Sequence, residues 1–132
     1  MRRGDLIRFV ATERHEPYGH RSGVFQTAYR LCDQRRLTGS DHRELRTILD
    51  WFEQHLAKPS RFARSGRAHA TGAAIAWMRA SAPDYLIRLR SLVALVETTG
   101  IVVEELRTIR PGYVVYQDEH QVIALPFADT PR

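Results

Sequence analysis

The residues best suited to chemistry form a basic loop in the middle of the chain, in the run KPSRFARSGRAHATG. Arginines recur there at every third position, with an aromatic residue among them and a histidine after them. The candidate contact residues are Lys58, Arg61, Phe62, Arg64, Arg67 and His69. Spaced guanidinium groups can neutralise successive phosphates, and an aromatic ring can stack on an unpaired base. We therefore predict that this loop contacts nucleic acid.

Two other interpretations of the loop stay open. Positive charge without acidic neighbours also suits docking on an acidic protein surface, and a solvated loop can serve solubility alone. Residues 54–83 hold five basic residues and no acidic one, which equals the net charge of the whole chain, +5. Nineteen of the twenty basic residues are arginine. Arginine suits bidentate contact with phosphate and carboxylate, although codon bias in a GC-rich bacterial genome would produce the same preference.

The second candidate is the end of the chain, ELRTIRPGYVVYQDEHQVIALPF. Two runs of β-forming residues, 113–117 and 121–125, flank the polar turn Asp118, Glu119 and His120, which predicts a C-terminal β-hairpin. In the first run, residues 113, 115 and 117 are expected on one face, with 114 and 116 on the other. A carboxylate beside a histidine can orient the imidazole for general acid or base catalysis. A polar hairpin tip is equally ordinary for a turn.

The elements that must position these groups follow from periodicity and turn residues. In chain order they are a strand over 6–12, a polar loop over 13–23, a helix capped by Ser22 and ending near Leu37, a helix capped by Ser40 and ending at Pro59, a strand over 72–79, a helix from a Ser81–Asp84 capping box to Gly100, and strands over 101–108, 113–117 and 121–125.

This order, β-α-α-β-α-β-β-β, predicts a single compact α+β domain over 1–132. We expect a mixed sheet of about five strands, with three helices packed mainly on one face. Strands 72–79 and 101–108 would be parallel neighbours joined by a right-handed crossover. Alternation of large apolar residues with alanine favours a strand at 72–79, although the same residues are compatible with a helix.

Composition excludes several classes of function. No apolar run is long enough to span a bilayer. The basic start MRRGDLIRF has too short an apolar stretch for a signal peptide, so we expect a cytoplasmic protein. The single Cys32 cannot form an internal disulfide. The six histidines lack metal-ligand spacing, and no nucleotide-binding or nucleophile motif is present. We predict no metal, no cofactor and no catalytic residue.

Two resemblances begin at the hairpin. The run RPGYVVYQDEHQVIA, with DWFEQHL and PSRF upstream, resembles a family of small uncharacterised bacterial proteins from GVFQTAYRL to the end of the chain, and it implies no activity. The segment ELRTIRPGYVVY is similar to the sheet of RelE/HigB-like toxins, which are ribosome-linked ribonucleases. That resemblance implies an alternative site at Arg107, Arg110, Tyr116 and His120. Val114 stands where those toxins usually carry a basic residue, and the chain lacks their basic ending.

The sequence thus predicts a small basic bacterial protein without enzymatic activity, which contacts nucleic acid or a complex that handles it through the arginine-rich loop. One alternative is a ribonuclease toxin of the RelE/HigB kind. The other is an adaptor or inhibitor that docks on an acidic partner surface. A homodimer also stays open, because Trp51 lies off the apolar stripe of its predicted helix and could cover an interface.

Overall fold

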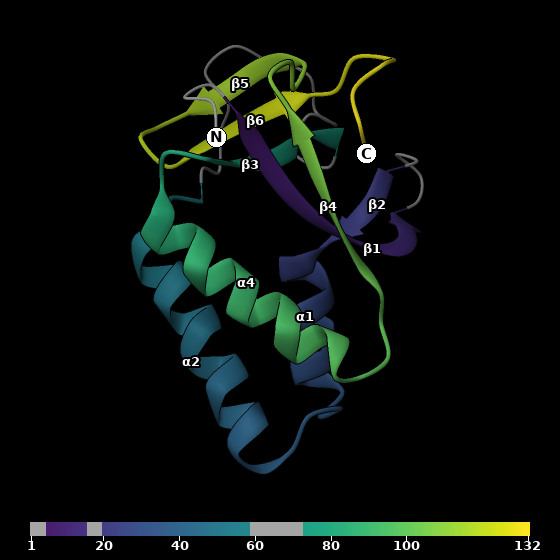
Figure 1. Cartoon of the computed structure of the whole chain (residues 1–132), viewed down its shortest axis with the longest axis vertical. Helices are drawn as coiled ribbons and strands as arrows, with labels where there is room; N and C mark the ends of the chain where they lie inside the picture. Colours follow the sequence, from purple (N-terminus) through teal and green to yellow (C-terminus); the bar gives the residue numbers. More distant parts are fainter. Residues whose placement is uncertain (1–4, 16–19, 59–72) are drawn as a thin grey trace. The chain divides into compact units, whose positions relative to one another are not determined.

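The computed structural model describes residues 5–15, 20–58 and 73–132 (Figure 1). In chain order the elements are β1 (Leu6–His15), β2 (His20–Gly23), α1 (Val24–Asp33), α2 (Gly39–His55), β3 (Ile75–Arg79), α4 (Pro83–Glu97), β4 (Val103–Thr108), β5 (Tyr113–Gln117) and β6 (Gln121–Leu125). The predicted α+β class is confirmed, and so are the strand at β3 and the bounds of β5 and β6. The predicted loop 13–23 contains an additional short strand, β2.

The strands form a curled sheet in the order β2-β1-β3-β6-β5, with β4 paired to β1. The pairs β1–β2, β1–β3, β3–β6 and β5–β6 are antiparallel. The predicted parallel pairing of 72–79 with 101–108 is wrong, because β3 lies between β1 and β6. Strand β6 is buried at four successive residues, Gln121 and the apolar residues 122–124. Such a strand is covered on both faces and belongs inside a sheet, so β6 takes the place beside β3.

By internal contacts the chain divides into two compact units. The first unit consists of Met1–Arg8, Lys58–Leu86 and Glu105–Arg132, and the second consists of Phe9–Ala57 and Ile87–Glu104. Each has buried apolar residues of its own. They include Ile7, Ile75, Trp77, Val115 and Val122 in the first unit, and Val10, Leu31, Leu45, Leu49, Leu92 and Val96 in the second.

The helix starts differ from the sequence prediction. Helix α1 begins after Gly23 and α2 after Thr38, and neither of these capping residues makes a side-chain cap hydrogen bond. The predicted caps are therefore wrong. Ser22 is buried in β2, and Ser40 lies exposed within the first turn of α2. The buried stripe of α2 has the predicted positions, Leu45, Ile48, Leu49 and Phe52.

Helix α1 also ends four residues before the predicted end at Leu37. The N–H of Arg36 donates to the carbonyl of Leu31, and the N–H of Arg35 donates to that of Cys32. These two bonds form a Schellman motif, which requires a left-handed residue after the helix. Arg35 adopts that conformation, with φ 50°. Because glycine is the residue expected at this position, the arginine gave no sequence signal that the helix ends here.

Candidate functional site

The predicted basic loop lies mostly outside the described residues. Lys58 is described, follows α2 and is exposed. Arg61, Phe62, Arg64, Arg67 and His69 fall between the described ranges 20–58 and 73–132. The contacts of these five residues therefore stay a prediction from the sequence.

The two units differ sharply in charge. The first unit contains eleven basic and six acidic residues, and the second contains nine of each. The whole net charge of +5 therefore belongs to the first unit, which also contains the basic loop. Clustered charge of one sign attracts ligands of the opposite sign and speeds their association.

Three acidic residues of the first unit already have partners outside the loop. Glu105 pairs with Arg107 at 2.6 Å, and Asp129 pairs with Arg110 at 3.0 Å. Asp118 is occupied by hydrogen bonds at the tip of the β5–β6 hairpin. Half of the unit's six acidic side chains are thus engaged by residues other than those of the loop.

The carboxylate of Asp118 organises the hairpin tip. Its Oδ1 accepts hydrogen bonds from the backbone N–H groups of His120, at 2.8 Å, and Gln121, at 3.0 Å. Its Oδ2 accepts from the hydroxyl of Tyr116, at 3.0 Å, and from Nε2 of Gln121, at 3.3 Å. Partial burial alone would raise the pKa of Asp118, but these four hydrogen bonds outweigh it and lower the pKa below its ordinary value. Asp118 therefore acts as an ionised anchor for the turn.

Two further side chains, those of His120 and Arg79, make contacts at the tip. The ring of His120 stacks on Tyr85, with centroids 4.2 Å apart and planes 18° apart. Arg79 donates through Nε to the carbonyl of Asp118, at 2.8 Å, and through Nη2 to Oε1 of Gln117, at 2.9 Å. The hydrogen bond to Asp118 is the main cause that raises the pKa of Tyr116. These contacts are those of a firmly held turn.

The alternative ribonuclease-like residues divide between two places. Tyr116 and His120 both bond to Asp118, one through its hydroxyl and the other through its backbone N–H. Arg107 and Arg110 instead pair with Glu105 and Asp129. The contacts thus bring together the tyrosine and the histidine, while each arginine is tied to a carboxylate elsewhere.

Sequence reasoning missed a group of exposed side chains near the start of β5. Val114 pairs with Ala124 and Tyr116 with Ile123, so β5 has one extra residue at this point. Val115, the extra residue of this β-bulge, is buried, whereas Tyr113 and Gln117 are exposed. The prediction that residues 113, 115 and 117 share a face is therefore wrong. A prediction that assumes strict alternation of residues between the two faces of a strand cannot indicate a bulge.

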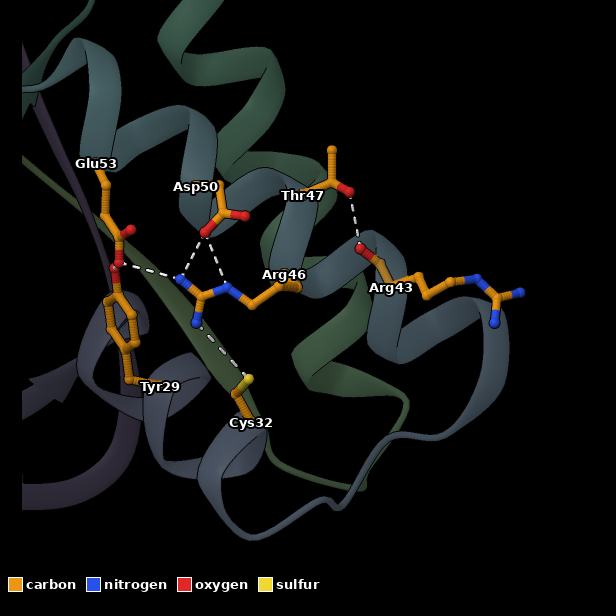
Figure 2. Close-up of polar contacts among 7 residues, drawn as sticks. All are labelled: Tyr29, Cys32, Arg43, Arg46, Thr47, Asp50 and Glu53. Atoms are coloured by element: carbon orange, nitrogen blue, oxygen red, sulfur yellow. Dashed lines mark hydrogen bonds and ion pairs between the residues drawn. The ribbon is translucent and has the colours of Figure 1, made fainter.

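The second unit contains a polar network that joins α1 to α2 (Figure 2). Arg46 donates to Asp50 through Nε, at 2.9 Å, and Nη2, at 2.6 Å, and Nη2 also donates to Glu53, at 3.1 Å. Tyr29 donates its hydroxyl to Glu53, and Sγ of Cys32 lies 4.0 Å from Nη1 of Arg46. Burial, followed by the hydrogen bond to Glu53, raises the pKa of Tyr29 to about 12. The network ties the two helices together.

Trp51, which lies off the apolar stripe of α2, is covered by two neighbours within its own unit. The guanidinium carbon of Arg88 lies 3.9 Å from the centroid of the indole ring, and the ring of His55 stacks on it at 4.2 Å. A guanidinium over an indole face is attracted by the ring quadrupole. The half-buried Trp51 therefore packs between α4 and its own helix.

Among residues 5–15, 20–58 and 73–132, no three histidine, cysteine, aspartate or glutamate side chains gather as a metal site would require. No helix within these ranges combines the length and apolar character that crossing a membrane demands. Comparison of the chain with protein-family models, curated proteins and solved structures gives no significant match. Both family resemblances consequently stay predictions.

Proposed function

We propose that this protein binds nucleic acid through the arginine-rich loop at 58–69 and does so without catalysing a reaction. The observation that carries the proposal is the distribution of charge. The first unit holds the entire net charge of +5, and within it residues 58–83 contribute five basic residues with no acidic one. Each arginine that contacts a phosphate releases a condensed counterion, which supplies sequence-independent affinity.

The contacts at the hairpin tip give the Asp118 carboxylate a role in the turn. The Asp118 carboxylate accepts four hydrogen bonds, and the ring of His120 stacks on Tyr85. A general base needs a free lone pair within reach of the proton that it removes. The occupied Asp118 serves the turn instead, so the loop is the better candidate for contact with a ligand.

The test is the binding of a labelled single-stranded oligonucleotide across a series of salt concentrations. The variant carries Arg61→Ala, Arg64→Ala and Arg67→Ala. We expect weaker binding and a salt slope smaller by about two, because each phosphate contact on a single strand contributes about 0.7.

A matched control removes the same charge from the second unit, through Arg35→Gly, Arg36→Ala and Arg43→Ala. These three arginines are exposed, and glycine is used at position 35 because its φ is positive. The control should keep most of the affinity and the slope. Equal losses in the two variants would mean that net charge alone causes binding, and absence of binding by the unaltered protein at low salt would overturn the proposal.

A further inference from the structure

Three exposed apolar side chains lie in the turn before β5, at the start of β5 and in the segment after β6. Ile109 is 66% exposed, Tyr113 is 50% exposed and Phe127 is 38% exposed. They are three of the five large apolar side chains that are exposed within the described residues, and all three belong to the first unit. We call Ile109, Arg110, Tyr113 and Phe127 the aromatic patch.

A close backbone approach holds the two segments of the patch together. Tyr113 pairs with Leu125 in the β5–β6 ladder. Gly112 has φ 125°, and a Cβ at this position would lie 2.0 Å from the carbonyl oxygen of Leu125 and 2.8 Å from Cα of Pro126. Only glycine permits this approach. The turn that carries Arg110 and the segment that carries Phe127 are therefore fixed side by side.

The patch presents flat groups to solvent. The guanidinium carbon of Arg110 lies 4.7 Å from the centroid of the Phe127 ring, and Nη1 of the same arginine pairs with Asp129 at 3.0 Å. The ion pair keeps the guanidinium in place beside the ring. An aromatic face and a guanidinium plane are the two surfaces on which proteins stack unpaired bases.

We infer that the aromatic patch stacks unpaired bases of single-stranded nucleic acid. The inference rests on the proposed function, and it adds the kind of strand that is recognised. The unit that carries the patch has a net charge of +5, which attracts a polyanion. An acidic protein surface would match the charge but has no need of exposed aromatic planes. A single strand offers both phosphates and unpaired flat bases.

The test compares two labelled oligonucleotides of equal length, one with bases and one made entirely of abasic units. The variant is Tyr113→Leu with Phe127→Leu, which keeps apolar bulk and removes both aromatic planes. Stacking is worth about 1–3 kcal/mol per base, so we expect the variant to bind the normal strand about tenfold or more weakly. Its affinity for the abasic strand and its salt slope should be unchanged.

The control is Ile87→Ala, which truncates a side chain 63% exposed on the second unit and should alter neither affinity. Circular dichroism and thermal unfolding establish that the variants are folded.

If the unaltered protein binds both strands and the double variant binds the normal strand equally well, the patch does not stack bases, while the proposed function stands. Equal losses on the two strands also overturn the inference. If the unaltered protein binds neither strand, the proposed function fails and the inference fails with it. RNA and DNA versions of the normal strand show which sugar is preferred.

Discussion

The two units of the molecule differ in how many acidic residues accompany their arginines. In the neutral second unit, described arginines contact carboxylates and aromatic rings, such as Arg21 with Glu104 at 2.6 Å and Arg88 over Trp51 at 3.9 Å. The first unit contains eleven basic and six acidic residues, and three of those six acidic residues already have partners outside the loop.

This difference shows that arginine content alone says little about function. A guanidinium beside a carboxylate or an indole helps to hold helices together, and it offers less to a ligand. An excess of guanidinium groups over local carboxylates attracts phosphate. The number of arginines is similar in the two units, so the difference in net charge comes mainly from the number of acidic residues.

The largest expected effect comes from breaking the backbone approach in the first unit. Gly112→Ala places a Cβ against the backbone of Leu125 and Pro126, which neither residue can relieve by a side-chain movement. We expect a loss of about 3 kcal/mol or more in the free energy of unfolding, measured by urea denaturation. Gly39→Ala in the second unit is the matched control. Gly39 also has a positive φ but no atom within 4 Å, so about 1 kcal/mol is expected. Equal losses would show that strain in φ, and not the close approach, governs both sites.

The next largest loss of stability is expected from replacing Asp118, which anchors the hairpin tip. Asp118→Ala leaves four donors without their acceptor, and we expect a loss of about 2 kcal/mol at pH 7. Because folding lowers the pKa of Asp118, its ionised form stabilises the protein above the unfolded pKa of about 3.9. That stability is lost as the pH falls through the folded pKa. The destabilisation by Asp118→Ala should therefore shrink as the pH falls below about 3.9, and a value that stays constant from pH 7 into strong acid would contradict the assignment. Glu119→Ala at the same tip serves as the control.

A smaller effect is expected when an ion pair is removed from each unit and the two losses of stability are compared. Arg46→Ala removes contacts with Asp50, Glu53 and Cys32, whereas Arg107→Ala removes, among the described residues, the ion pair with Glu105. Both pairs are partly exposed, so we expect about 1 kcal/mol for Arg46 and about 0.5 kcal/mol or less for Arg107. Urea denaturation in low and high salt measures both values. A larger loss at Arg107 would reverse the comparison.

The smallest effect is a change in the titration of Tyr29, which is observed only in alkali. The pKa of Tyr29 is raised to about 12, so its protonated form contributes stability that is complete below the unfolded pKa of about 10. That stability is lost as the pH rises from 10 through 12. Ultraviolet titration of tyrosinate should show that Tyr29→Phe removes a late-titrating group. A curve whose late part is unchanged by Tyr29→Phe would contradict the role of the Tyr29–Glu53 contact.

Much of the fold could be predicted because its signals are local. The stripe of α2 follows from helical periodicity, Gly100 marks the end of α4 with φ 93°, and β5 and β6 flank a polar turn that only a hairpin explains. The strand β2 could not be predicted, because its four residues form a strand only by pairing with a bulged β1. The neighbours of β3 were missed for the same reason, since pairing depends on residues distant along the chain.

The same distinction between local and long-range information applies to the candidate site. The sequence alone determined the acid-free run of arginines and the net charge, since both are properties of composition and order. The tertiary structure decided which carboxylates occupy which arginines. Arg21 and Glu104, for example, are 83 residues apart in the chain. It also decided that Val115 is buried at a bulge while Tyr113 is exposed, that Gly112 approaches Leu125, and that Arg110 lies over Phe127. Charge is carried by each residue wherever it lies, whereas a contact exists only after the folded backbone has brought distant residues together.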